Sequence, residues 1–244
     1  MTIFVRFFGK GANFLSFFLL LNNLDIKVVG EYGLIFTTLF IFSIAMDMGL
    51  RNSIGTNQEN RISINKSFTK LRNHTIACIP GFIIIGLVTS YSINLNYNYS
   101  LGIICSILLL HITYTRTAQG IILSNNNVKL INKLDFTQKT TFLVLIIVLI
   151  KIEELTIYTT LFSLIISFST NLLFCVLRYG NDGKNDFMFF SKDIYKNGLM
   201  FMLTAFTMIL LTKYNILYSS IKFDSSYSGI YFSVIRISEI TTEI

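Results

Sequence analysis

The sequence predicts an all-α fold, a polytopic transmembrane helical bundle of about eight helices. The first observation behind this prediction is composition: of 244 residues, 52% are hydrophobic and only 14% are charged, and the mean hydropathy is +0.62. A soluble domain is about one quarter charged, so this chain lacks the polar surface that a globule in water needs. The second observation is that the apolar residues form runs of about 20 residues, enough for a helix to cross a bilayer.

Eight apolar runs meet or approach this length, and short polar segments separate them. In chain order, the runs are Ile3–Leu24, Tyr32–Leu50, Thr75–Leu95, Leu101–Leu123, Leu134–Ile150, Leu155–Leu177, Gly198–Ile221 and the run from Gly229 onward. Pro80 lies in the first turns of the third run, where it predicts a kink because proline lacks the backbone N–H of a helix interior. The short connecting segments hold no domain suited to soluble-type catalysis.

The fifth run is the weakest of the eight. Its fully apolar core, Phe142–Ile150, is too short to cross a membrane, and the residues before it, Leu134–Lys139, are largely polar. We expect a helix that turns the polar face of this half toward partner helices or water. A re-entrant segment is the alternative.

Lysine and arginine are distributed unevenly between the two sets of loops. Twelve lie after the second, fourth and sixth runs, whereas the opposite loops hold only Lys27, Lys151 and Lys222. Cytoplasmic loops carry the excess of Lys and Arg, so we expect a cytoplasmic N-terminus. The alternation also requires the fifth run to cross the membrane. The twelve residues are Arg51, Arg61, Lys66, Lys70, Arg72, Lys129, Lys133, Lys139, Arg178, Lys184, Lys192 and Lys196.

This count of spans suggests a division of the chain into three parts. We expect a first six-helix transmembrane bundle over residues 1–177, a cytoplasmic linker over 178–197, and the first two helices of an incomplete second bundle over 198–244. The last run, from Gly229 to Ile244, makes about 24 Å of helix, which is short of a full crossing. We therefore expect the chain to be the N-terminal part of a longer protein.

Five cations lie within or near the apolar runs, where a central charge costs about 2.5–3.5 kcal/mol even on insertion scales. Intramembrane arginine usually faces the interior of a bundle, so Arg116 and Arg236 are expected to line a cavity. For Arg6, Lys10 and Lys213, the alternative is that the long side chain reaches the headgroup region. All five are candidate substrate-binding residues.

Carboxylates stand close to some of these cations in the sequence. Glu239 lies three residues after Arg236, and Glu243 follows one turn later. An Arg–Glu pair within one helix lowers the cost of both charges, so Glu239 joins the cavity candidates. Asp47 lies four residues before Arg51, a spacing that predicts a structural ion pair at the membrane edge.

Other reactive side chains form no pattern of a catalytic or metal site, and no cofactor is expected. Cys78, Cys105 and Cys175 fall inside apolar runs without a metal-ligand spacing, as small hydrophobic residues of a bundle do. His111 lies in the middle of the fourth run, where it is either a hydrogen-bonded structural residue or a proton relay. The sequence has no basic stripe with interleaved aromatic residues, so no nucleic-acid partner is expected.

Two stretches of the sequence form motifs. Residues 30–52 open with GEYG and close with DMGLRN, and residues 229–240 read GIYFSVIRISEI. They resemble the "G-x-Y-G … D-x-G-L" second helix and the "G-x-Y … R-I-x-E" segment of the Wzx-type O-antigen and polysaccharide flippases. These flippases belong to the MOP (multidrug/oligosaccharidyl-lipid/polysaccharide) superfamily. Gly30-x-Tyr32 also matches Gly229-x-Tyr231, as expected of transporters built from repeats.

The resemblance implies a protein of the bacterial inner membrane with two six-helix bundles around a central cavity, working by alternating access. Its substrate would be an undecaprenyl-diphosphate-linked oligosaccharide, the O-antigen repeat unit used in lipopolysaccharide and polysaccharide biosynthesis. Interior cations suit this substrate, since Arg and Lys bind phosphate well. The implied partners are this lipid-linked oligosaccharide, membrane lipid, a polysaccharide polymerase and a chain-length regulator. Asn215 stands where many members carry Asp in the seventh helix.

Three alternatives remain for the function. A MATE-like drug or metabolite antiporter of the same superfamily is expected to carry acidic residues in its first or seventh helix, which this sequence lacks. A membrane polysaccharide polymerase or an acyl or glycosyltransferase is expected to have a large outer loop, so the chain is not expected to be an enzyme. The third alternative is a truncated chain that is inactive by itself.

Overall fold

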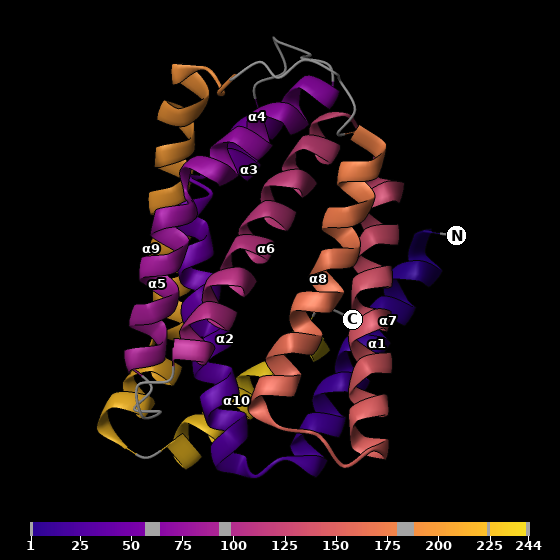
Figure 1. Cartoon of the computed structure of the whole chain (residues 1–244), viewed down its shortest axis with the longest axis vertical. Helices are drawn as coiled ribbons and strands as arrows, with labels where there is room; N and C mark the ends of the chain where they lie inside the picture. The colour runs from indigo at the N-terminus through magenta and orange to yellow at the C-terminus, as the bar shows by residue number, and fades with distance from the viewer. Residues whose placement is uncertain (1, 57–63, 93–98, 180–187, 224, 243–244) are drawn as a thin grey trace.

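The computed structural model of the chain describes residues 2–56, 64–92, 99–179, 188–223 and 225–242. Within these ranges the chain forms ten α-helices and no strand, gathered in one bundle (Figure 1). The all-α prediction is confirmed. The helices are α1 (Thr2–Asn23), α2 (Ile26–Met46), α3 (Leu50–Thr56), α4 (Ile64–Ala77), α5 (Ile79–Ser92), α6 (Tyr99–Ser124), α7 (Val128–Lys151), α8 (Ile157–Tyr179), α9 (Lys192–Lys222) and α10 (Ser225–Thr242).

The length and hydropathy of the helices identify a membrane protein. Five described helices, α1, α2, α6, α8 and α9, are long and apolar enough to cross a membrane, and α4 with α5 form a sixth candidate as a bent pair. Large apolar side chains such as Phe4, Ile84, Leu177 and Leu211 lie exposed on the outside of the bundle, where lipid can cover them. The chain is therefore a multi-pass membrane protein. The two remaining predicted runs form α7 and α10.

The third predicted run is kinked, as its proline predicts. α4 and α5 meet at an angle of 53° across Cys78, two residues before Pro80. A proline removes one N–H donor from the helix, and its ring collides with the carbonyl group four residues earlier. The bend follows from this local defect.

α2 ends earlier than the sequence predicts, at Met46 rather than at Leu50. Met48 and Gly49 take left-handed conformations, with φ of 49° and 66°, which terminate a helix. Asp47 stabilises this turn, because its Oδ1 accepts a hydrogen bond of 2.6 Å from the Gly49 N–H. The chain then re-enters helix in α3 and α4, so the segment predicted as a loop is largely helical.

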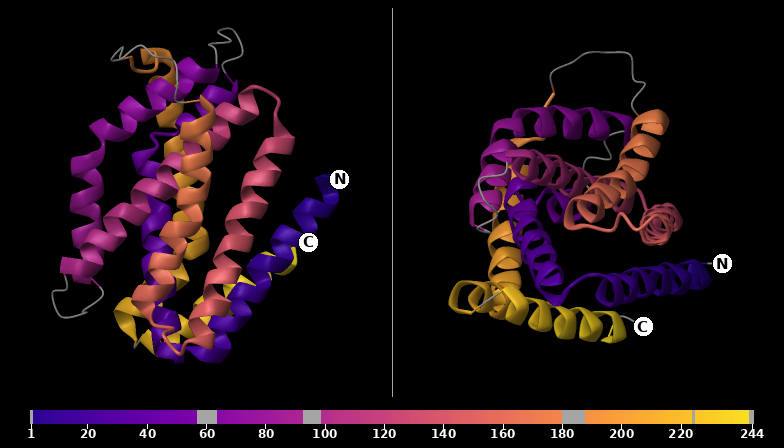
Figure 2. Two further views of the ribbon diagram at one scale, coloured as in Figure 1. Left: turned by 45° about the vertical axis from the view of Figure 1, so that its right-hand side comes forward. Right: turned by 60° about the horizontal axis from the view of Figure 1, so that its bottom comes forward.

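α7 is one continuous helix of 24 residues, so the re-entrant alternative is wrong. Asn127 caps its N-terminus: the side-chain oxygen accepts a hydrogen bond of 3.3 Å from the Leu130 N–H. The polar half of α7 faces α1, where Arg6 Nε donates to Asn132 Oδ1 over 3.2 Å. The left view of Figure 2 shows α1 and α7 running side by side.

The apolar core is built around α6, which runs through the middle of the bundle (Figure 1). Leu108 of α6 packs in one buried cluster with Ile35 and Leu39 of α2 and Leu161 of α8. A second cluster includes Leu50 of α3. Burial of these side chains fixes α2 and α8 around α6, and thereby fixes the helices that carry the candidate site.

Glycines bring α9 and α10 to backbone distance from α2 and the turn that follows it. A Cβ on Gly30 would overlap the Ser225 carbonyl oxygen and lie 2.7 Å from the Gly229 nitrogen. At the other end of α2, a Cβ on Gly49 would overlap the carbonyl oxygen of Gly198 in α9. The two glycine contacts, Gly30·Gly229 and Gly49·Gly198, therefore depend on the absence of side chains.

Candidate functional site

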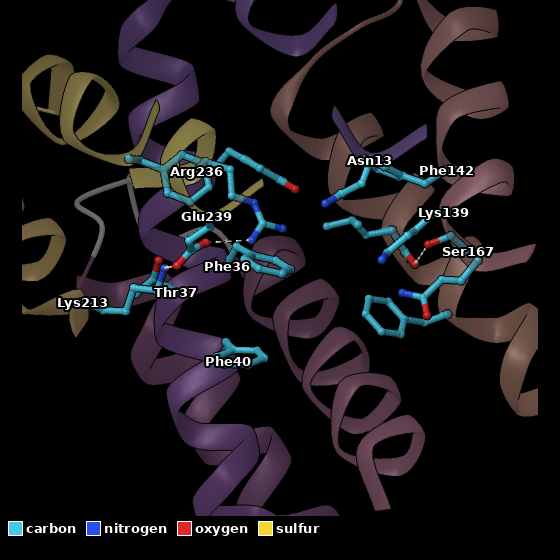
Figure 3. A pocket seen from close by; sticks show the side chains of 15 residues that line it. Asn13, Phe36, Thr37, Phe40, Lys139, Phe142, Ser167, Lys213, Arg236 and Glu239 are labelled. Carbon is cyan, nitrogen blue, oxygen red and sulfur yellow. Dashed lines mark hydrogen bonds and ion pairs between the residues drawn. The ribbon is translucent and has the colours of Figure 1, made fainter. Parts of the chain in front are cut away.

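A cleft lies between α2, α9 and α10 on one side and α1, α7 and α8 on the other (Figure 3). Its volume is about 360 Å³, within the range of small-molecule sites. Fifteen side chains line it: six aromatic, three cationic, one acidic, four uncharged polar and one leucine. The lining is thus suited to a ligand that is apolar in one part and negatively charged in another.

The charged side chains of one wall come from α9 and α10. Lys213 Nζ pairs with Oε1 of Glu239, and Arg236 Nη1 lies 3.2 Å from Oε2 of the same carboxylate. The exposed fraction is 15% for the side chain of Lys213, 27% for Arg236 and 35% for Glu239. All three side chains can therefore be reached from the cleft.

Aromatic side chains of α2 form the base of this wall. Tyr32, Phe36 and Phe40 follow one another at four-residue spacing, so they share one face of the helix. Consecutive rings stack with centroids 6.2 Å and 6.3 Å apart. The Arg236 guanidinium carbon lies 5.4 Å from the centre of the Phe36 ring, a cation–π contact. The ring therefore orients the guanidinium.

The opposite wall carries a cation of its own, Lys139 of α7. Its Nζ lies 2.8 Å from Asp135 Oδ2, one turn earlier. Its neighbour Gln138 accepts a hydrogen bond of 2.8 Å from Asn171 of α8. Figure 3 shows Lys139 and Arg236 on opposite sides of the open space. An anionic group bound between the walls would have cations on two sides.

The structure brings some of the predicted residues together and separates others. Lys213, Arg236 and Glu239 meet in the cleft, and the pair within α10 has the predicted i, i+3 geometry. Arg6 and Lys10 lie on α1 outside the lining. Glu243 lies outside the described residues.

Arg116 and Asp47 form a second charged cluster; neither residue is part of the cleft lining. Arg116 Nε lies 3.5 Å from Asp47 Oδ2, and the Asp47 side chain is 1% exposed. The Arg116 guanidinium carbon also lies 5.0 Å from the centre of the Phe40 ring. The predicted pair of Asp47 with Arg51 is therefore corrected to a pair with Arg116. The turn at Met48 breaks the helix, so the i, i+4 geometry behind the prediction does not apply.

The side chains of His111, Cys105 and Cys175 have the surroundings of structural residues. His111 contacts the Ile107 carbonyl oxygen at 2.8 Å and Ser169 Oγ of α8 at 3.0 Å, as a structural histidine does. Cys105 and Cys175 are buried and unpaired. Among the described residues, no group of three His, Cys, Asp or Glu side chains could hold a metal ion.

The sequence alone did not identify most of the uncharged side chains that line the cleft, nor the cation Lys139. Lys139 was counted only as a loop cation, although α7 carries it into the cleft. The row of Tyr32, Phe36 and Phe40 was a usable signal, because its four-residue spacing is visible in the sequence.

The search of solved structures finds two MATE crystal structures. A MATE protein in complex with MaD3S matches with a TM-score of 0.63 at 14% identity, covering 99% of this chain and 60% of that one. A MATE protein in the straight conformation matches with a TM-score of 0.60 at 13% identity, covering 98% of this chain and 62% of that one. No protein-family model and no curated protein matches the sequence.

These comparisons establish the fold of the chain. It is the fold of MATE transporters, which belong to the MOP superfamily that the sequence motifs resemble. The chain spans about three fifths of the length of the MATE chains that it matches. The likeness does not single out the Wzx type within the superfamily.

Proposed function

We propose that the chain is part of a secondary transporter that moves an amphipathic, anionic substrate across a membrane by alternating access. The observation that carries this proposal is the lining of the cleft, with three cations, one carboxylate and six aromatic rings. Arg and Lys form charge-assisted hydrogen bonds with phosphate or carboxylate groups. Aromatic rings contact apolar groups over a large area.

The fold comparisons favour a MATE-like drug or metabolite antiporter over the O-antigen flippase that the motifs suggested. In this form of the proposal, the cleft selects negatively charged drugs or metabolites. A cationic drug fits poorly, because the carboxylate of Glu239 is already paired with Lys213 and Arg236.

The lipid-linked oligosaccharide flippase is the second candidate, and the opposed cations favour it. A diphosphate between Arg236 and Lys139 would meet a cation on each side, while sugar or isoprenyl groups contact the rings of α2. This candidate includes a bacterial inner-membrane location with a cytoplasmic N-terminus. Its partners would be undecaprenyl-diphosphate-linked O-antigen units, membrane lipid, a polysaccharide polymerase and a chain-length regulator.

Binding of three probes to the purified chain in nanodiscs tests the proposal and separates the candidates. The probes are farnesyl diphosphate, benzoate and the lipophilic cation tetraphenylphosphonium, and the readout is the dissociation constant from calorimetry. We expect an anionic probe to bind at least about tenfold more tightly than the cation, a difference of about 1.4 kcal/mol. Farnesyl diphosphate as the tightest ligand favours the flippase, and benzoate favours the antiporter. Tighter binding of the cation would contradict the proposal.

Variants of the charged wall connect this binding to the cleft. Lys213→Gln and Arg236→Gln should each weaken binding of the anionic probe about tenfold, because each removes a charge-assisted contact. Lys151→Gln is the matched control, since Lys151 is an exposed cation at the far end of α7. Equal losses in all three variants would indicate a nonspecific effect of charge.

A further inference from the structure

Glu239 occupies the place where an anionic ligand would bind. Its two carboxylate oxygens contact cations on two helices, Lys213 of α9 and Arg236 of α10. A phosphate oxygen makes the same contacts with ammonium and guanidinium groups as a carboxylate oxygen does. A ligand anion and the Glu239 side chain therefore compete for the same donors.

The geometry also allows this exchange. At 35%, Glu239 is the most exposed of the three charged side chains, so it can leave the pair without opening the core. Arg236 stays in place when Glu239 leaves, because Phe36 lies 5.4 Å beneath the guanidinium carbon. A guanidinium has five N–H donors, and Arg236 contacts Oε2 of Glu239 through Nη1.

The balance of charge gives the exchange its direction. Two cations and one carboxylate leave one positive charge in the cluster, and a diphosphate brings more negative charge than a single carboxylate. Partly buried charges interact more strongly than charges in water, since the surrounding dielectric constant is lower. A multivalent anion can therefore replace a carboxylate that is already attached to the protein.

We propose that Glu239 is an internal counter-ion of the cleft: it holds Lys213 and Arg236 when the site is empty, and the anionic group of the substrate displaces it. This inference rests on the proposed function and adds a regulatory residue to that site. An anion binds only to the fraction of molecules in which Glu239 has moved away, so the measured affinity is reduced by that fraction. Removal of the carboxylate should thus tighten binding.

The test measures binding of inorganic pyrophosphate to the purified chain in phosphatidylcholine nanodiscs, which present no anionic lipid. Glu239→Gln should lower the dissociation constant about tenfold, as expected if the carboxylate is in place about nine-tenths of the time. Glu239→Asp should lie between the wild type and the Gln variant, because its shorter side chain keeps the charge but cannot reach both cations. Glu154→Gln, at an exposed glutamate after α7, should leave the dissociation constant unchanged.

Each outcome supports or overturns a distinct statement. Unchanged or weaker binding by Glu239→Gln, together with weaker binding by Lys213→Gln and Arg236→Gln, overturns the counter-ion role and leaves the proposed function standing. Unchanged pyrophosphate binding in the Lys213→Gln and Arg236→Gln variants overturns both the counter-ion role of Glu239 and the proposed function. If Glu239→Gln does not fold, Glu239→Asp is the deciding variant, because it retains a compensating negative charge. Pyrophosphate binding by Glu239→Asp that is no tighter than that of the wild type overturns the inference.

Discussion

Two arginines lie on phenylalanine rings of α2, and each pairs with a carboxylate, but the two clusters differ in exposure. Arg116 lies on Phe40 and pairs with Asp47, whose side chain is 1% exposed. The Asp47 carboxylate also caps the turn at Gly49. The Arg116 side chain is 15% exposed, so the enclosed member of this cluster is the carboxylate, which is also bound to the backbone.

The second cluster, Arg236 with Glu239 and Lys213, has similar contacts but is accessible from the cleft. Arg236 lies on Phe36 and pairs with Glu239, which is 35% exposed and also pairs with Lys213. Because a second cation is present and the cleft gives access, the pair can exchange partners. The comparison indicates that the exposure of the carboxylate, 1% for Asp47 and 35% for Glu239, rather than residue type, separates a structural ion pair from a candidate binding site.

The largest expected effect comes from breaking the enclosed pair. Asp47→Ala leaves the Arg116 charge buried without its partner, which should cost about 3–5 kcal/mol of stability. Unfolding of the purified chain by SDS titration in mixed micelles measures this change. Asp47→Ala combined with Arg116→Met should recover more than half of the loss, because the buried charge is gone. A single variant as stable as the wild type would contradict the structural role.

The second largest effect on stability should come from disturbing the Gly30·Gly229 contact, which places α10 and its charged residues against α2. In Gly229→Ala, the new Cβ would overlap the Ile26 carbonyl oxygen and lie 3.1 Å from the Gly30 nitrogen, so α10 must shift. We expect a loss of about 1–3 kcal/mol in the same titration and weaker pyrophosphate binding. Gly11→Ala is the control, because a Cβ there would have no atom of another described segment within 4 Å. Equal effects of the two changes would argue against a close contact.

Removal of the exposed carboxylate should affect stability far less than removal of Asp47. Partly exposed ion pairs contribute about 0–1 kcal/mol, so Glu239→Gln should remain within about 1 kcal/mol of the wild type in the SDS titration. Its effect should appear in ligand binding instead. A loss as large as that of Asp47→Ala would remove the distinction between the two clusters.

The smallest effects should come from changes to the rings of Phe36 and Phe40. The Phe36 change should act mainly on ligand binding, and the Phe40 change mainly on stability. Phe36→Leu removes the cation–π contact of Arg236, worth about 0.5–1 kcal/mol, and should weaken pyrophosphate binding about two- to fivefold. Phe40→Leu removes the contact of Arg116 and should lower stability by a similar amount. Its effect on the dissociation constant should be smaller than that of Phe36→Leu, because the Phe40 ring holds Arg116 rather than Arg236. Calorimetry and SDS titration on both variants check this. Identical profiles would show that the two rings act alike.

The elements that depend on local sequence could be predicted. The apolar runs gave the helices because span length and hydropathy are local properties, and the kink followed from Pro80. The pair of Arg236 with Glu239 could be predicted for the same reason, since both residues lie on one helix. All eight predicted runs therefore lie in helices, but only five described helices, or six with the bent pair α4 and α5, are long and apolar enough to cross a membrane. The ends of the helices also differ from the predicted ones.

Contacts between distant segments could not be predicted. Nothing in the spacing of Asp47 indicates Arg116 as its partner, because the pair depends on how α2 packs against α6. Charge counts likewise assign Lys139 to a side of the membrane without showing that α7 carries it into a cleft. Of the cleft lining, the sequence therefore indicated the charged residues of α9 and α10 and missed the residues of α1, α2, α7 and α8.

The glycine contacts at the two ends of α2 have a mechanical consequence. Gly30 and Gly49 are separated by roughly 30 Å if the chain between them rises as a helix, which is close to the thickness of the hydrocarbon core. One contact, Gly30·Gly229, therefore belongs near one membrane face, and Gly49·Gly198 near the other. If the chain takes part in the alternating-access cycle proposed above, α9 and α10 could separate from α2 at one end, with the intact contact at the other end as the pivot.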